Sequence, residues 1–102
     1  MKTYTDAQLR AIARAAIQTN YTWNHHGPPT TVTDDMELGN NGLGYDAGGL
    51  RDLVKELNAA FEARECPINL GLNALDKCVT VADAIKVAKD AAKKPKAHAG
   101  NK

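Results

Sequence analysis

The apolar residues of this chain recur at helical spacing in three long stretches. Apolar side chains at positions i, i+3, i+4 and i+7 share one face of a helix and predict a stripe that packs against a core. The first stretch covers about residues 6–20, the second covers 47–63, and the third begins at Thr80. The second stripe consists of Leu50, Leu53, Val54, Leu57, Ala60 and Phe61. The pattern therefore predicts three long amphipathic helices.

Polar residues at the starts of these stretches are typical of helix caps. Thr5 and Gln8 have the spacing of a capping box, in which each side chain bonds the backbone N–H of the other residue. Asp46 is a candidate N-cap for the second helix, and Thr80 with Asp83 forms a weaker capping box for the last. These signals agree with the helix starts that the apolar pattern predicts.

A short fourth helix is predicted between the second and the last. Pro67 ends the second helix, and apolar residues resume at Leu72 and Leu75, within residues 69–77. Alanine and leucine dominate the apolar set, while aromatic residues make up 5% of the chain, which favours helices over sheets. The expected fold is all-α, a small four-helix bundle with three long helices and one short one.

A long polar stretch, residues 22–46, separates the first two helices. Gly27-Pro28-Pro29 cannot continue a helix, and later glycine and asparagine residues predict turns. A loop of this length in a compact domain is often functional. The apolar residues expected to hold it against the core are Val32, Met36, Leu38, Leu43 and Tyr45.

Length and charge narrow the class of protein. The 102 residues suffice for one domain, expected at 1–92, followed by a basic disordered tail at 93–102. The formal net charge of +1 gives no electrostatic argument for binding nucleic acid or membranes. No apolar run is long enough to cross a bilayer, and the first residues lack the apolar segment of a signal peptide. We expect a cytoplasmic monomer.

The cysteines and histidines are weak candidates for metal or redox chemistry. Cys66 and Cys78 stand twelve positions apart without nearby histidines, so both are expected to be structural thiols. His25 and His26, with His98 as a distant third ligand, are interpreted as solvated side chains, and the acidic loop lacks the register of a calcium site. No nucleophile–base pair stands at catalytic spacing, so we expect neither a metal nor an enzyme.

Several short motifs occur in the order found in one protein family. Leu43-Gly44-Tyr45-Asp46-Ala47 precedes the second helix, whose Phe61 follows Ala47 by fourteen positions. Pro67 comes next, and Thr80-Val81-Ala82-Asp83-Ala84-Ile85 opens the last helix. Over about residues 6–90 the chain therefore resembles the acyl carrier and peptidyl carrier proteins. That family has a Leu-Gly pair and an Asp-Ser-Leu motif at the start of its second helix.

The resemblance implies a site at position 47. In the family, the serine of that motif carries 4′-phosphopantetheine, whose thiol holds an acyl group, and a helix N-terminus favours a phosphate. Here Asp46 is kept, Ala47 replaces the serine, and Gly48 replaces the leucine; the chain contains no serine at all. Alanine has no oxygen to receive the phosphate. Ala47 is therefore either a replacement for an attachment serine or the native residue of an unmodified carrier-like protein.

The resemblance also implies partners. A carrier presents acyl groups to enzymes of fatty acid, polyketide or related biosynthesis and is loaded by a phosphopantetheinyl transferase. The residues expected to meet these partners are Tyr45, Leu50, Arg51, Asp52, Lys55 and Glu56. A candidate acyl cavity would be lined by Leu53, Val54, Leu57, Phe61 and Ile85. The second helix of the family is acidic, whereas this one carries both signs of charge, which predicts a different set of partners or weaker electrostatic steering toward them.

A second hypothesis is a helical interaction protein that shares the carrier topology but is never acylated. The Asp46-Ala47-Gly48-Gly49 run and the mixed charge of the second helix favour it. The two hypotheses differ in one respect that can be measured, namely whether a serine at position 47 makes the chain a substrate for modification.

Overall fold

Three helices form the framework of the molecule. The structure is a computed structural model that describes residues 3–24, 31–39 and 41–93. The helices are α1 (Asp6–Asn24), α2 (Ala47–Ala63) and α3 (Val81–Lys93). Within those three ranges there is no strand, and Glu37 and Thr80 form an isolated antiparallel bridge. The predicted all-α class is confirmed. No helix among the described residues combines the length and hydropathy that crossing a bilayer requires.

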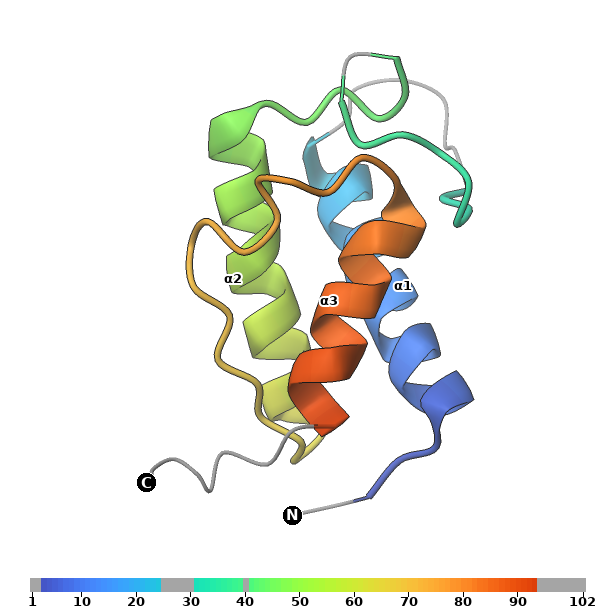
Figure 1. Ribbon diagram of the computed structural model, residues 1–102, viewed down its shortest axis with the longest axis vertical. Coiled ribbons are helices and arrows are strands. Elements are labelled where there is room, and N and C mark those ends of the chain that lie inside the picture. The colour runs from blue at the N-terminus through green and yellow to red at the C-terminus, as the bar shows by residue number, and fades with distance from the viewer. Residues whose placement is uncertain (1–2, 25–30, 40, 94–102) are drawn as a thin grey trace.

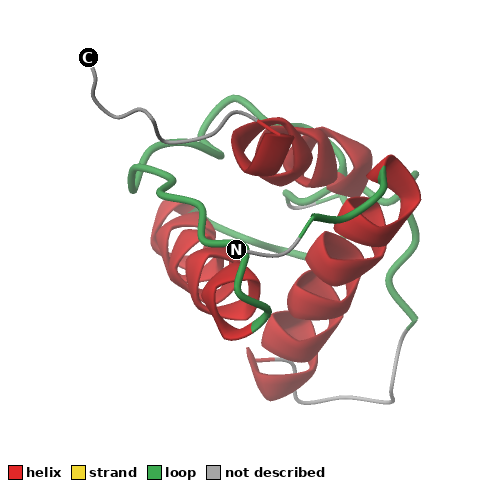
Figure 2. Cartoon of the chain, turned by 90° about the horizontal axis from the view of Figure 1, so that it is seen from below, coloured by secondary structure: helices red, strands yellow, loops and turns green. Residues whose placement is uncertain are grey.

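The helices enclose one core. α1 packs against both α2 and α3, and a view along the bundle shows the three helices around a common centre (Figure 2). The largest fully buried side chains come from all three helices and from both connections: Ile17, Leu38, Leu53, Val54, Leu57, Phe61, Leu75, Val81 and Ile85. The start of α2 lies at one end of the bundle, and the start of α1 and the end of α3 lie at the other (Figure 1).

The predicted caps of α1 and α2 are confirmed. The N–H of Thr5 donates to Gln8 Oε1 at 2.8 Å, and the N–H of Gln8 donates to Thr5 Oγ1 at 3.1 Å. At the start of α2, Asp46 Oδ1 accepts from the N–H of Gly49 at 2.7 Å. Each of these bonds satisfies a donor that the first turn of a helix leaves without an intrahelical partner.

The weaker capping box of α3 is also present. The N–H of Asp83 donates to Thr80 Oγ1 at 3.3 Å, while Asp83 Oδ2 accepts from the N–H groups of Val79 and Thr80 at 3.0 and 3.1 Å. Because these donors favour the ionised carboxylate, the pKa of Asp83 is lowered from its ordinary value. The start of α3 therefore depends on an ionised Asp83.

α1 is longer than the predicted 6–20. The helix continues to Asn24, and Tyr21 extends the apolar stripe by one turn beyond Ile17 and is buried. Asn20 is buried as well, with a relative exposure of 4%. Burial of Tyr21 thus supports helix where the sequence indicated the start of a loop, although Trp23 of the same turn is 79% exposed. His25 and His26 of the metal hypothesis lie outside the described residues, as does His98.

The short fourth helix is not present in the structure, and turns take its place. Backbone hydrogen bonds of the i to i+3 type join Gly71 to Ala74, Asn73 to Asp76, and Leu75 to Cys78. Ahead of them, the Asn58 amide bonds both the N–H and the C=O of Leu70, at 2.9 and 3.1 Å. Because α2 holds the backbone there, and because Gly71 is a poor helix former, the segment follows the surface of α2 without winding into a helix.

The long loop is held by its apolar residues and by one ion pair. Val32 and Leu38 are buried, and Met36, Leu43 and Tyr45 pack against the core in part, as predicted. Arg14 Nε lies 2.8 Å from Asp34 Oδ1, and this contact holds the pKa of the Asp34 carboxyl below its ordinary value. The described part of the loop is therefore fixed to α1 by both packing and charge.

The loop is also fixed to the start of α3. The N–H of Leu38 donates to the C=O of Val79, and the N–H of Val81 donates to the C=O of Met36, both at 2.8 Å. These bonds join two segments that are far apart in the sequence, as Figure 1 shows at the upper end of the bundle. Of the predicted tail at 93–102, Lys93 is the last residue of α3, and the rest lies outside the described residues.

Removing a core side chain of α2 should destabilise the protein strongly. Leu57 is fully buried, so Leu57→Ala is expected to lower the free energy of unfolding by about 2–5 kcal/mol, through lost burial and a residual cavity. Urea unfolding followed by circular dichroism measures this. Val79→Ala is the control, because Val79 is 58% exposed and its loss should cost no more than about 0.5 kcal/mol. Equal losses would contradict the described core.

Candidate functional site

Ala47 is the first residue of α2 and is exposed to solvent. Asp46 before it has the extended backbone of an N-cap, with φ −95° and ψ −173°, and its carboxylate occupies the N–H of Gly49. A side chain at position 47 therefore leaves the molecule at a helix start, next to a carboxylate. The prediction that α2 begins at about Ala47, with Asp46 as its N-cap, is confirmed.

The two glycines that follow Ala47 have different surroundings. A Cβ at Gly49 would lie 3.0 Å from Tyr45 Cδ1 and 3.2 Å from Asp46 Oδ1, so a side chain there would press on both. A Cβ at Gly48 would lie 3.7 Å from Asp46 Oδ1, an ordinary contact. Gly49 thus allows the Tyr45 ring to approach the helix, whereas position 48 has room for a Cβ atom.

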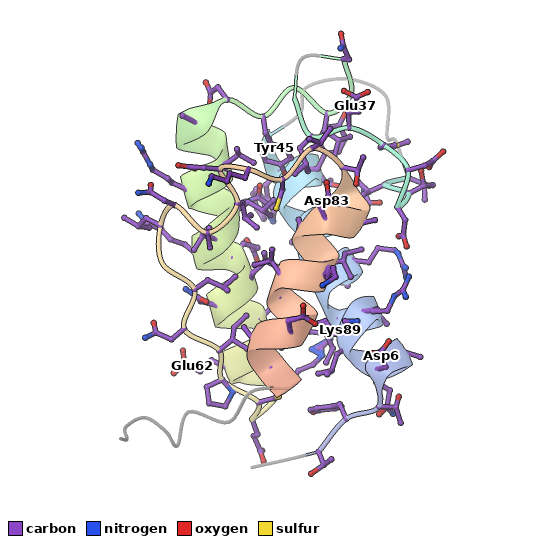
Figure 3. All side chains as sticks on the ribbon, in the orientation of Figure 1. Asp6, Glu37, Tyr45, Glu62, Asp83 and Lys89 are labelled. Atoms are coloured by element: carbon purple, nitrogen blue, oxygen red, sulfur yellow. The ribbon has the colours of Figure 1, made fainter. Side chains whose placement is uncertain are left out.

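The loop before α2 reaches the helix through a constrained turn. Gly44 has a φ of +80°, a conformation that residues with a Cβ rarely adopt. The next residue, Tyr45, donates its N–H to the C=O of Leu38 at 2.7 Å. The turn at Gly44 therefore aligns Tyr45 with the first segment of the loop, and Figure 3 shows Tyr45 at this end of the bundle.

A hydrogen-bond network connects this loop to two helices. Tyr45 OH donates to Asn20 Oδ1 at 2.8 Å, and Asn20 Nδ2 donates to Asp52 Oδ2 at 2.9 Å. Asn20 belongs to α1 and Asp52 to α2, so one buried amide joins α1, the loop and α2. Sequence reasoning did not assign Asn20 to the site. The signal that could have found it is a polar side chain on the apolar stripe of the first helix.

The pKa of Tyr45 reflects this position. Burial raises the pKa of its phenol well above the ordinary value, and the nearby carboxylates of Asp52 and Glu56 and the phenol of Tyr21 raise it further. Tyr45 therefore stays protonated and acts as a hydrogen-bond donor across the ordinary pH range.

A hollow of about 470 Å³ lies beside the start of α2. Its lining residues come from α1, the loop and α2: Tyr21, Leu43, Gly44, Tyr45, Asp46, Gly48, Gly49 and Asp52. The walls combine two phenol rings with two carboxylates. Ala47 is a neighbour of this hollow in sequence, between two of its lining residues.

The residues predicted to meet partners divide into two groups. Arg51, Asp52 and Lys55 are exposed, while Tyr45, Leu50 and Glu56 are partly buried. Tyr45 and Asp52 already take part in the network with Asn20. Five of these six positions lie on the first ten residues of α2, and Tyr45 lies just before it. Among the exposed three, Asp52 is bonded to Asn20, while Arg51 and Lys55 make no hydrogen bond or ion pair with other described residues.

The residues predicted to line an acyl cavity are packed together in the core. Leu53, Val54, Leu57 and Phe61 have no exposed surface, and Ile85 is 2% exposed. Ile85 also lines a small hollow between α1 and α3, together with Arg10 and Lys86. In this conformation the five side chains serve as the core.

Metal and thiol chemistry find little support in the described ranges. No group of three histidine, cysteine or acidic side chains there is arranged to hold a metal ion. Cys66 is a buried free thiol and Cys78 a partly buried one. Burial, together with the charge of Asp83, raises the pKa of the Cys78 thiol and so lowers its reactivity.

The residue at the tip of α2 does not fit the phosphopantetheine group that the family resemblance implies. A phosphodiester needs a hydroxyl oxygen, and the methyl group of Ala47 supplies none. Comparisons with models of known protein families, with curated proteins and with solved structures find no match to this chain.

Replacing Tyr45 should change how the protein titrates in alkali. In the wild type, part of the phenol absorbance change is expected only well above pH 10, and Tyr45→Phe should abolish that late part. Since folding raises this pKa above its unfolded value of about 10, the contribution of Tyr45 to stability is complete below pH 10 and is lost as the pH rises through the folded-state pKa. Ultraviolet titration and alkaline urea unfolding measure both effects.

Tyr4→Phe is the matched control for this titration. Tyr4 donates to the C=O of Arg64 at 2.7 Å, at the opposite end of α2, so its removal should leave the late part of the titration in place. A late part that persists in Tyr45→Phe would show that the described burial of Tyr45 is wrong.

Proposed function

We propose that this chain is a carrier-type module whose partner-facing site is the exposed start of α2. With a hydroxyl at position 47, the module would present phosphopantetheine-tethered acyl groups to enzymes of fatty acid, polyketide or related biosynthesis. It would catalyse no reaction itself, and it would act as a cytoplasmic monomer. In this proposal, the turns at 71–78 stand in place of the short helix of a four-helix carrier bundle.

The observation that carries the proposal is the position of Ala47. It is an exposed first residue of a helix, preceded by an N-cap carboxylate and by a loop that the Asn20 network fixes. A side chain at that point is accessible to a modifying enzyme and rigidly oriented, because the loop, α1 and α2 all meet beside it. Such placement suits a residue that a partner enzyme must find and modify.

As the sequence stands, the site acts without an attached group. The residues around position 47 can bind and orient a partner, through the exposed face of α2 and the hollow beside it. They cannot form the covalent link, since Ala47 lacks a hydroxyl. The proposal therefore separates two properties, a scaffold that partners recognise and an attachment point that serine would supply.

Ala47→Ser should restore the attachment point. After incubation with coenzyme A and a broad-specificity phosphopantetheinyl transferase, the variant is expected to gain the mass of one phosphopantetheine. The reason is that its hydroxyl would stand exposed at the helix start. Intact-mass spectrometry reads the result directly, with the unaltered protein measured beside it.

Ala59→Ser is the matched control. Ala59 is also exposed on α2 but lies inside the helix, so a serine there should remain unmodified. A gain in Ala47→Ser alone supports the carrier scaffold. No gain with several transferases, in a variant whose circular dichroism matches that of the unaltered protein, would refute it.

A second candidate function is a non-acylated interaction module. The observation that favours it is Ala47 itself, together with the exposed cations Arg51 and Lys55 on a helix that is acidic in the carrier family. In that case, the start of α2 would still dock a partner, but no covalent group would be involved. A folded Ala47→Ser variant that no transferase modifies is the result that this alternative expects.

A further inference from the structure

The exposed charges of α2 are sorted onto two sides of the helix. Arg51 and Lys55 are one turn apart, so their Cβ atoms lie about 6 Å from each other on one row. Asp52 and Glu56 form the neighbouring row, about 100° further around the helix axis. The two rows face different surroundings.

The acidic row is turned toward the loop. Asp52 accepts a hydrogen bond from Asn20, and Asp52 and Glu56 both lie near enough to Tyr45 to raise its pKa, which burial raises most. Glu56 is also partly buried. Asp52 is therefore engaged in the site described above, and Glu56 is partly withdrawn from a partner that approaches from outside.

The cationic row, by contrast, has no partner within the part of the chain that the structure describes. Neither Arg51 nor Lys55 makes a hydrogen bond or ion pair there, and both are exposed. The positions one turn before and one turn after them are Ala47 and Ala59. Like charges at this spacing repel each other, so a bound carboxylate would relieve an existing repulsion.

An exposed apolar side chain lies on the connection that α2 holds through Asn58. Asn58 continues the cationic row of Arg51 and Lys55 along α2, and its amide is hydrogen-bonded to the backbone of Leu70. Leu72 is two residues further on, within about 7 Å of Leu70 along the chain, and it is 51% exposed. Figure 1 shows this connection running back beside α2. The surface thus combines two unpaired cations with one exposed leucine.

The geometry points to a docking site for an acidic, amphipathic segment of a partner protein, centred on Arg51, Lys55 and Leu72. The carboxylates of such a segment match the spacing of the cationic row, and an apolar side chain next to them covers Leu72. Glu62 lies one turn beyond Asn58, and its charge is opposite to that of Arg51 and Lys55. It would repel a bound carboxylate, which confines the site to the first half of α2. The site rests on the proposed function only for the choice of α2 as the partner-facing helix.

The test is a titration with a synthetic helical peptide that has glutamates on one face and leucines on the other. Backbone NMR shifts are expected to cluster at residues 51–58 and 70–72. Arg51→Gln/Lys55→Gln should weaken binding about fivefold to tenfold, since each exposed pair adds a modest amount. Added salt should weaken the binding of the unaltered protein more than that of the double variant.

Two controls make the result decisive. Lys86→Gln removes an exposed cation of α3 and should leave peptide affinity unchanged, and a peptide with glutamine in place of glutamate should bind no better to the unaltered protein than to the double variant. The inference is overturned by shifts centred on α3 or on residues 94–102, by equal affinity for the double variant, or by no binding at millimolar peptide. Position 47 takes no part, so failure here is distinct from failure of Ala47→Ser to be modified.

Discussion

The buried amide of Asn20 is the contact that the end of the bundle containing the start of α2 depends on. A buried amide costs free energy unless its donor and acceptor are both bonded, and here the acceptor meets Tyr45 while the donor meets Asp52. Each partner comes from a different part of the chain. Losing either partner would remove one of the bonds that join these three segments. The backbone turn at Gly44 and the cap at Asp46 place Tyr45 and Ala47 beside this network.

The two sides of α2 have different roles. The inner side packs in the core, and the outer side is open to a partner. The centre of its inner face is fully buried, since Leu53, Val54, Leu57 and Phe61 have no exposed surface. Its outer face and its first turn remain in solvent, where a partner can reach them. A ligand that entered between the helices would have to displace well-packed side chains, at the cost that dense interiors impose on any change of volume. Recognition at the surface of α2 needs no such rearrangement.

The sequence predicted the features that depend on residues close together in the chain. It did not predict the features that depend on contacts between residues far apart in the chain. The cap at Asp46, the bounds of α2 and its buried stripe follow from local spacing, and the structure agrees. The extra turn of α1 depends on burial of Tyr21, and the turns after Leu70 depend on Asn58, twelve positions earlier. The position of Ala47 at the start of α2 was likewise predictable, because the Asp46 cap fixes that start. The link from Asn20 to Tyr45 spans 25 positions, and only the polar break in an apolar stripe hinted at it.

The bundle places the start of α1 and the end of α3 together, at the end remote from the start of α2 (Figure 1). A segment joined to either of these helices at that end would lie on the side of the bundle away from Ala47 and the cations of α2. A linker attached there would limit the distance over which the module can diffuse. It would leave the exposed surface of α2 uncovered. The same orientation would leave that surface open to a binding partner while the module stayed attached.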